Sequence, residues 1–204
     1  MACDKPQIDK DGNGILFYGD ARVNFVKDIE GQPNVFLMEV QAELERDTQA
    51  TPEPGQFYMI KGSRSNVTFG RPISVYHSER SGKTLKVQFM ILEKGEGTKE
   101  MRKLLPGDML SMNGPLGNTF GEFNNETNGR MAIIGGGIGV APVANFASSL
   151  PNGSYVFYAS YKSGSYGLEF INAQNLVITT DDGSRGIHGM LSAAFTKETI
   201  QTNG

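Results

Sequence analysis

Apolar and polar residues alternate with a period of two along much of the first half of the chain, which is typical of half-buried β-strands. The clearest strand occupies a segment in which every second residue is apolar: Leu85, Val87, Phe89 and Ile91. Weaker alternation predicts a hairpin over residues 22–41 with its turn at 31–34, and strands over 56–61, 72–76 and 108–112. Turns rich in proline and glycine are predicted at 52–55 and 114–117.

One segment of this region changes to helical spacing. Apolar residues recur at Met101, Leu104 and Leu105, and Pro106-Gly107 ends the pattern, so we predict a helix over residues 98–105. A run of strands with one short helix is typical of a small antiparallel β-barrel. We therefore assign residues 1–21 to a polar N-terminal arm and residues 22–123 to the barrel.

The pattern changes again after a polar, linker-like run at 124–129. The predicted elements are then a strand (131–134), a glycine loop (135–139), a helix (142–150) and two strands (155–160 and 176–180). This order predicts a parallel sheet with crossover helices over residues 129–204. The segment is short for a doubly wound fold, so we expect an incomplete Rossmann-like α/β domain.

The composition narrows the possible functions. The chain has 19 lysines and arginines and 22 aspartates and glutamates, so no basic surplus is available for nucleic-acid binding. The single cysteine, Cys3, excludes a disulfide or a cysteine-ligated metal centre within these residues. We interpret His77 and His188, far apart in sequence, as surface or hydrogen-bonded residues. The most apolar stretch, 132–147, is shorter than the roughly 20 residues of a membrane span, so we expect a cytoplasmic protein without a membrane partner.

The segment Arg71-Pro72-Ile73-Ser74 carries the first candidate chemistry. In extended backbone, Arg71 and Ile73 face one way and Ser74 the other. An arginine can bind a phosphate pair through its forked guanidinium, and a serine hydroxyl can donate to or accept from a flavin ring nitrogen. The alternative is a surface arginine beside an edge-strand proline.

The segment Gly95-Glu96-Gly97-Thr98 opens the predicted helix. Thr98 is a candidate N-cap, and free amides at a helix start attract phosphate when glycines permit a close approach. The alternative is an ordinary capped helix after a glycine turn.

Two further segments follow strands of the α/β domain. The loop Gly135-Gly136-Gly137-Ile138-Gly139 lies between a strand and a helix, as a nucleotide phosphate site requires, but it lacks the GxGxxG pattern and no acid follows about 20 residues later. A tight turn for packing is the alternative. The loop 180–184 includes Asp181, a candidate ligand contact, although adjacent carboxylates are more often part of a solvated turn.

The order of the motifs resembles the ferredoxin–NADP reductase superfamily, and within it the electron-transfer subunits of class B dihydroorotate dehydrogenases. The resemblance rests on the segments 54–57, 71–74, 95–98, 105–108, 114–118, 135–142 and 180–184. It implies an FAD-binding barrel followed by a nicotinamide-nucleotide domain. It also implies a partner catalytic dehydrogenase subunit, from which electrons pass through a [2Fe–2S] cluster to FAD and then to NAD⁺.

The resemblance also implies roles for individual residues. The FAD would be held by Arg71 on the pyrophosphate, by Pro72 and Ile73, and by Ser74 near the flavin N5. Gly97 and Thr98 would also contact the pyrophosphate. The strand end Ile91-Leu92-Glu93 would line the flavin. Residues Gly135, Gly136, Gly137, Ile138 and Gly139 would receive the NAD(P) phosphates, with Asp181 nearby.

The chain departs from the family in three ways. The four cysteines of the family's cluster are absent, the Cys-Gly-Pro loop of the superfamily is absent, and the second domain is short. We therefore expect a truncated chain that binds FAD without turning over, and the alternative is a natural chain that has lost its electron-relay tail. One alternative is the small subunit of a ferredoxin–NADP⁺ reductase, for which Lys162 and Ser163 are candidate contacts of the NADP 2′-phosphate. Another is a non-catalytic binding module on a reductase-like barrel.

Overall fold

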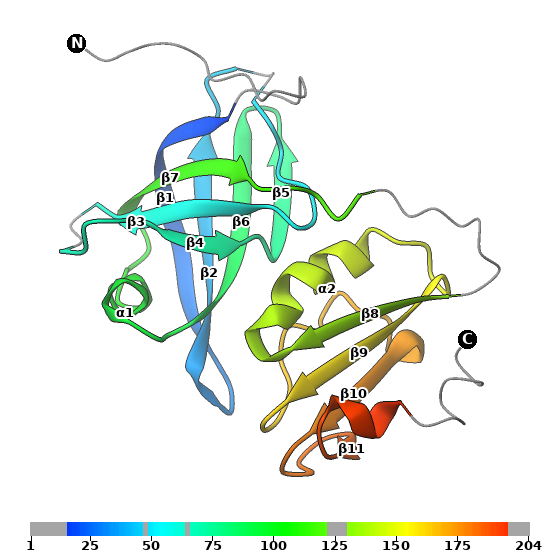
Figure 1. Ribbon diagram of the computed structural model, residues 1–204. Helices are drawn as coiled ribbons and strands as arrows, with labels where there is room; N and C mark the ends of the chain where they lie inside the picture. Colours follow the sequence, from blue (N-terminus) through cyan, green and yellow to red (C-terminus); the bar gives the residue numbers. More distant parts are fainter. Residues whose placement is uncertain (1–15, 47–48, 64–65, 122–129, 196–204) are drawn as a thin grey trace. The chain divides into compact units, whose positions relative to one another are not determined.

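The computed structural model describes residues 16–46, 49–63, 66–121 and 130–195, and it contains two compact units (Figure 1). The first unit holds most of the described residues up to Thr119, and the second holds those from Phe120 onward. None of the helices in these described ranges has the length and apolarity of a membrane span. The polar run predicted as a linker, 124–129, lies outside the described residues.

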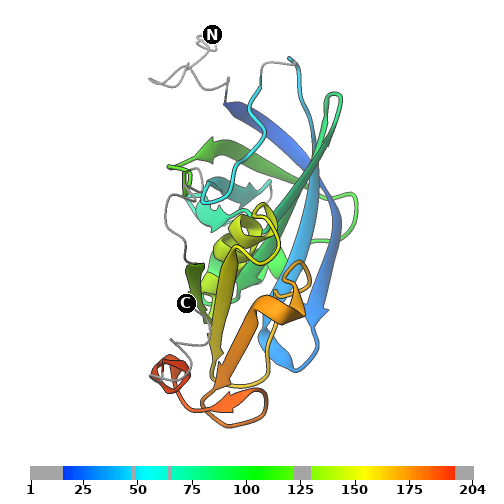
Figure 2. The same cartoon turned by 90° about the vertical axis from the view of Figure 1, so that its right-hand side faces the viewer.

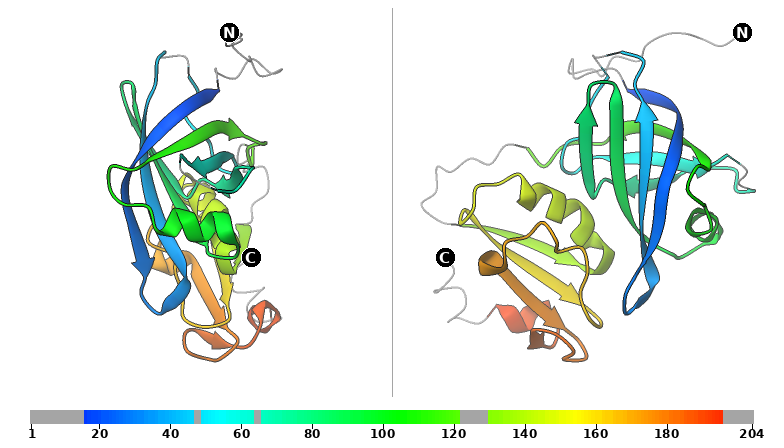
Figure 3. Two further views of the ribbon diagram at one scale, coloured as in Figure 1. Left: turned by 90° about the vertical axis from the view of Figure 1, so that its left-hand side faces the viewer. Right: turned by 180° about the vertical axis from the view of Figure 1, so that it is seen from behind.

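The first unit is built around a curled seven-stranded sheet with the strand order β4-β3-β7-β1-β2-β6-β5 (Figures 1 and 3). Its elements are β1 (Phe17–Ile29), β2 (Gln32–Glu43), β3 (Phe57–Gly62), β4 (Arg71–Ser74), β5 (His77–Ser81), β6 (Thr84–Leu92), helix α1 (Glu96–Arg102) and β7 (Met109–Leu116). The short strands β3, β4 and β7 cross over the long strands, so the sheet closes around its own core. The predicted antiparallel barrel therefore takes the form of a curled half-barrel.

The core of this unit follows the predicted alternation on β6. Its four alternating apolar side chains, Leu85, Val87, Phe89 and Ile91, are all essentially buried. β6 pairs antiparallel with β2, in a register that runs from Val35↔Leu92 to Glu43↔Thr84. Each large apolar side chain buried in this way contributes about 1.5–3 kcal/mol.

Several predicted ends were wrong. β1 begins at Phe17, so residues 17–21 of the predicted arm lie in the sheet and pair with β7. Phe17 is buried, but the polar residues that follow it mask the alternation in the sequence. β7 extends through Gly114 to Leu116, which we predicted as a turn. A Cβ atom at Gly114 would lie 2.6 Å from the ring of Tyr58. We infer that this position is a glycine because the ring occupies the space that a side chain would need.

Tyr58 provides a test of this core. Its side chain is fully buried, packs edge-on against Phe89, and its hydroxyl has no hydrogen-bond partner among the described residues. Burial raises the pKa of this hydroxyl, as expected for a phenol without a polar environment. A buried polar group without a partner destabilises the folded state.

We expect Tyr58→Phe to raise the free energy of unfolding by about 1 kcal/mol, since it removes the desolvated hydroxyl and keeps the ring. Urea denaturation of both proteins measures the difference. Tyr18→Phe is the control, because Tyr18 is 84% exposed and should show no change. A clear loss of stability in Tyr58→Phe would mean that the hydroxyl is paired in the folded protein.

The second unit contains a parallel four-stranded sheet with the order β11-β10-β9-β8 (Figures 1 and 2). Its elements are β8 (Met131–Gly136), helix α2 (Val140–Ser148), β9 (Tyr155–Tyr161), β10 (Leu176–Thr180) and β11 (Ile187–His188), with 3-10 turns at Gly137–Gly139, Ala173–Asn175 and Leu191–Ala194. The predicted parallel sheet is confirmed.

The inner strand β9 is buried along nearly all of its length. Val156 and Tyr158 pack against Ala194 of the 3-10 turn, while Phe157 between them points to the opposite face of the sheet. This two-sided burial explains the continuous apolar run in the sequence. Helix α2 starts two residues earlier than predicted and holds Pro142 in its first turn, where the missing N–H has no helical partner to lose.

Candidate functional site

Two of the predicted motifs meet in the first unit, at the edge strand β4 and the start of α1. The side chain of Arg71 lies against Gly97, and a Cβ atom on Gly97 would stand 3.0 Å from Arg71 Nε and 3.3 Å from Arg71 Cγ. Any larger residue at position 97 would push the guanidinium aside. The arginine and the glycine, which are distant in sequence, therefore form one candidate anion-binding corner.

The other residues of the RPIS segment are held by the neighbouring strand. β4 pairs with β3 so that Arg71 lies opposite Ile60 and Ser74 opposite Phe57. Pro72 is exposed, as expected for a residue without an N–H on an edge strand. Ile73 packs against the hydrophobic core, and Ser74 is half-buried at the end of the strand. The segment thus presents a cation at one end and a hydroxyl at the other.

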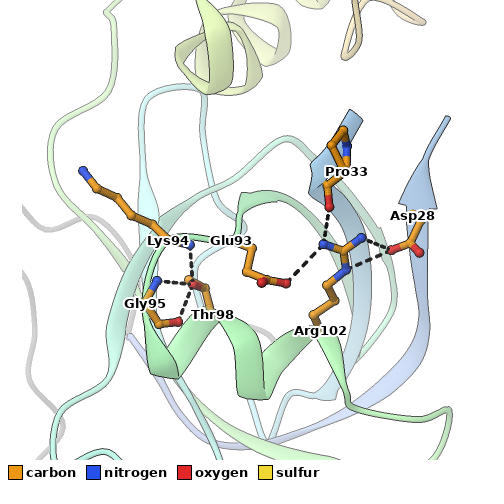
Figure 4. Close-up of polar contacts among 7 residues, drawn as sticks. All are labelled: Asp28, Pro33, Glu93, Lys94, Gly95, Thr98 and Arg102. Carbon is orange, nitrogen blue, oxygen red and sulfur yellow. Dashed lines mark hydrogen bonds and ion pairs between the residues drawn. The ribbon is translucent and has the colours of Figure 1, made fainter. Parts of the chain in front are cut away.

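The start of α1 differs from the prediction for Thr98 (Figure 4). The N-cap is Gly95, and Thr98 is the third helical residue. The Thr98 hydroxyl accepts from the backbone N–H groups of Lys94 (2.9 Å) and Gly95 (3.1 Å) and donates to the Gly95 carbonyl (2.9 Å). Thr98 caps the helix from inside, because its hydroxyl reaches back to amides that the helix leaves unpaired. Of the predicted pair, Gly97 is the residue left for a ligand.

The strand end Ile91-Leu92-Glu93 does not act as one surface. The Ile91 side chain is only 1% exposed and belongs to the core, so it could line a ligand only through its backbone. Leu92 points outward and is 37% exposed. Glu93 is half-buried, and its carboxylate is engaged by Arg102 at 3.1 Å.

Arg102, which the sequence analysis missed, joins three parts of the first unit (Figure 4). Its guanidinium donates to Asp28 (2.8 Å), to the backbone carbonyl of Pro33 (2.5 Å) and to Glu93 (3.1 Å). It also lies over the ring of Phe36, 5.9 Å from the ring centroid. The hydrogen bonds that Arg102 donates to Asp28 and Glu93 favour its charged form and raise its pKa. No local pattern marks this arginine, because its partners are distant in sequence.

The second candidate region is the edge of the parallel sheet where the strands end. Gly136 of β8 lies opposite Ser160 of β9, and Ser160 lies opposite Thr179 of β10. The hydroxyls of Ser160 and Thr179 are hydrogen-bonded at 3.0 Å. The glycine loop and the loops that follow β9 and β10 therefore share one edge, which is where open α/β sheets bind ligands.

The glycines of the loop have different environments. Gly135 is buried, and a Cβ atom there would stand 2.9 Å from the backbone of Val140, so this glycine allows α2 to pack against β8. At Gly135 the glycine is therefore explained by helix packing, the alternative considered in the sequence analysis. The residues from Gly136 onward lie at the edge of the sheet where the strands end. Gly136 and Gly139 are exposed, and a Cβ atom on either would meet nothing within 4 Å. Ile138 is half-buried.

The loop after β10 is fastened to the end of β9. Backbone N–H groups of Asp181 and Asp182 donate to the carbonyls of Tyr161 (3.0 Å) and Lys162 (3.3 Å). The Asp182 carboxylate accepts the Ser184 hydroxyl at 2.6 Å and the Ser184 backbone N–H at 3.0 Å. These donors lower the pKa of Asp182.

An acid therefore lies beside the end of β9 after all. The sequence offered none at the usual spacing from the glycine loop, but the Asp182 carboxylate is linked to the loop after β9 through Ser184, whose hydroxyl donates to Asp182 and accepts the Gly164 N–H at 2.8 Å. The exposed side chain of Asp181, the residue we predicted, has no comparable contact within the described part of the chain.

The described residues provide no ligand set for a metal cluster. No group of three or more His, Cys, Asp or Glu side chains that could hold a metal occurs among the described residues. Cys3, the single cysteine of the chain, lies outside them. These residues do not fit the four-cysteine site of a [2Fe–2S] cluster.

The chain is similar to curated proteins named "Dihydroorotate dehydrogenase B (NAD(+)), electron transfer subunit". The one from Clostridium acetobutylicum is 32% identical over 174 residues, which is 84% of this chain and 66% of that protein. The one from Clostridium perfringens is 36% identical over 165 residues, 78% of this chain and 64% of that protein. The one from Enterococcus faecalis strain OG1RF is 33% identical over 178 residues, 82% of this chain and 65% of that protein. The chain thus spans slightly less than two thirds of the length of these relatives.

Solved structures share the fold. A ferredoxin reductase in carbazole 1,9a-dioxygenase has a TM-score of 0.66 at 20% identity, covering 85% of this chain and 54% of that chain. The cytochrome b5 reductase domain of Ulva prolifera nitrate reductase has a TM-score of 0.59 at 15% identity, covering 92% of this chain and 82% of that chain. They confirm the predicted fold class. No protein-family model matches the chain.

Proposed function

Because this chain is 32–36% identical to dihydroorotate dehydrogenase B electron transfer subunits, we propose that it belongs to their family and carries FAD on its first unit and a nicotinamide nucleotide on its second. In this proposal it is an FAD-dependent oxidoreductase subunit that passes electrons between a partner dehydrogenase subunit and NAD⁺, as in pyrimidine biosynthesis. Such a partner would hold the dihydroorotate site. We also propose a cytoplasmic location.

The contact between Arg71 and Gly97 is the observation that carries the flavin assignment. It provides a cation held in place beside a residue without a side chain, which fits a pyrophosphate better than it fits a purely structural role. Ser74, at the far end of the same short strand, would then lie toward the ring system. When bound, FAD supplies the electron-accepting chemistry, and the protein binds and orients it.

Within this proposal, each residue has a limited task. Arg71 neutralises phosphate charge, Gly97 leaves room for it, and Ser74 offers a hydroxyl that can donate to or accept from a ring nitrogen. Leu92 offers an apolar surface, and Glu93 remains paired with Arg102. On the second unit, Gly136 to Gly139 offer backbone N–H groups and free space to the nucleotide phosphates.

An absorption spectrum of the purified chain between about 300 and 600 nm tests the flavin assignment, followed by release and identification of the cofactor. We expect the two bands of an oxidised flavin and the release of FAD. A colourless protein that also fails to take up added FAD would overturn the proposal and favour the non-catalytic binding module.

The position of the Asp182 carboxylate, linked through the Ser184 hydroxyl to the backbone N–H of Gly164, supports a preference for NAD⁺ over NADP⁺. Lys162 and Ser163 are the residues that would recognise a 2′-phosphate in the alternative ferredoxin–NADP⁺ reductase. The ionised carboxylate of Asp182 would repel that phosphate, whereas it can accept a ribose 2′-hydroxyl.

We expect Asp182→Asn to increase the affinity for NADP⁺ relative to NAD⁺ by roughly fivefold, because it removes a nearby negative charge that repels the 2′-phosphate. Titration of both nucleotides by calorimetry measures the ratio. Asp181→Asn is the matched control at the neighbouring position and should leave the ratio nearly unchanged. A larger change of the ratio in Asp181→Asn than in Asp182→Asn would mean that Asp182 is not the residue that discriminates between NAD⁺ and NADP⁺.

A further inference from the structure

Tyr166 lies outside every motif of the sequence and at the edge of the second candidate region. It follows β9, in the segment before the 3-10 turn at 173–175. The side chain is only 8% exposed, and its hydroxyl stands 3.8 Å from the point where a Cβ atom on Gly137 would lie. A buried tyrosine therefore points its polar end at the middle of the glycine loop.

The position of this hydroxyl is fixed by a second tyrosine. The rings of Tyr161 and Tyr166 pack with their centroids 4.9 Å apart at an angle of 56°. The Tyr161 hydroxyl donates to the backbone carbonyl of Tyr166 at 2.5 Å. The backbone and the ring of Tyr166 are thus both held in place. A ligand that binds to its hydroxyl therefore causes little loss of side-chain conformational entropy.

The Tyr166 hydroxyl is in a state to donate. No residue in the described ranges forms a hydrogen bond with it, although its neighbour Tyr161 is paired. Burial raises the pKa of Tyr166, which keeps the phenol protonated at neutral pH. A phenol O–H near the open space at Gly136 and Gly139 adds a side-chain donor to a site otherwise made of backbone.

We propose that Tyr166 is a nucleotide-binding residue whose hydroxyl donates to a phosphate oxygen of the dinucleotide on the glycine loop. This inference rests on the proposed function of the second unit. It assigns a side-chain donor to a phosphate site that was otherwise expected to use the backbone of residues 135–139. A hydrogen bond to a charged acceptor predicts an effect of about tenfold in affinity.

The test is calorimetric titration of the FAD-loaded full chain with NAD⁺, ADP and adenosine. Tyr166→Phe keeps the ring packing and removes only the hydroxyl, so it should weaken NAD⁺ and ADP about tenfold and leave adenosine unchanged. Tyr155→Phe makes the same chemical change at the opposite end of β9, on a residue that is also buried, and should bind all three ligands like the unmodified protein. Thermal unfolding of both variants checks that the fold is kept.

The outcomes separate the two proposals. Unchanged binding of NAD⁺ and ADP by Tyr166→Phe would overturn the role of the hydroxyl and leave the nucleotide site in place. An equal loss for adenosine would also overturn it, because the contact would then lie away from the phosphates. If the unmodified FAD-loaded chain binds neither NAD⁺ nor ADP, the proposed function of the second unit is wrong and the inference falls with it.

Discussion

Replacing Arg71 with alanine is expected to weaken FAD binding by about tenfold or more. The guanidinium lies beside Gly97, and a charge-assisted hydrogen bond to a phosphate contributes about 1.5–3 kcal/mol. Arg71→Lys should recover only part of this, since an ammonium cannot form the forked contact of a guanidinium. The measurement is the flavin content after gel filtration, together with FAD titration of the apoprotein.

Two further variants make this prediction specific. Gly97→Ala places a methyl group 3.0 Å from Arg71 Nε, and we expect an intermediate loss of FAD because the flexible arginine can shift. Arg22→Ala removes an exposed arginine from β1 and should keep full flavin occupancy. Normal flavin occupancy in a correctly folded Arg71→Ala protein would show that Arg71 is not a ligand.

The second large effect is expected at Gly186, in the loop between β10 and β11. Its backbone has φ +70°, and a Cβ atom there would lie 2.2 Å from the carbonyl oxygen of Ile178. Because the obstacle is backbone in the middle of the sheet, it cannot swing away. Strain in the left-handed region and overpacking together should lower the free energy of unfolding in Gly186→Ala by about 2–5 kcal/mol.

Gly183→Ala separates the effect of backbone strain from the effect of the steric overlap expected at Gly186. Gly183 has a similar backbone, with φ +71°, but a Cβ atom there would meet only the His188 side chain, at 3.2 Å. We expect a loss of about 1–2 kcal/mol, the cost of the left-handed conformation alone. Urea denaturation, with hydrogen exchange of the amides of β9 and β10 as the local probe, compares the two. Equal losses would mean that the sheet yields at Ile178, contrary to our expectation.

The sequence predicts strands well where burial is strongest. β6 alternates because one face is in the core, β9 is continuously apolar because both faces are covered, and β10 was predicted with its correct bounds. These hydrophobic patterns failed to predict the structure where a residue is determined by a contact with a residue distant in sequence. We interpreted Gly114 as part of a turn because the local sequence does not show that the ring of Tyr58 leaves no room for a side chain at this position.

The candidate site shows the same division. The residue types of the RPIS segment and of the glycine loop indicate phosphate chemistry from local sequence alone. Which glycine faces a ligand and which supports packing depends on α2, so Gly135 and Gly136 could not be distinguished in advance. The contacts of Arg102, Asp182 and Tyr166 join separate segments, and no period or spacing reveals them.

The position of Arg102 also bears on the order in which the first unit assembles. Its hydrogen bonds to Asp28 and Pro33 close chain segments of 74 and 69 residues, whereas the contact with Glu93 spans only 9. Long loops are slow to close, since their entropy is lost before the contact forms. We therefore expect the Arg102 contacts to form late, after β2 and β6 have paired. Mutations of Arg102 should then accelerate unfolding and leave the refolding rate nearly unchanged.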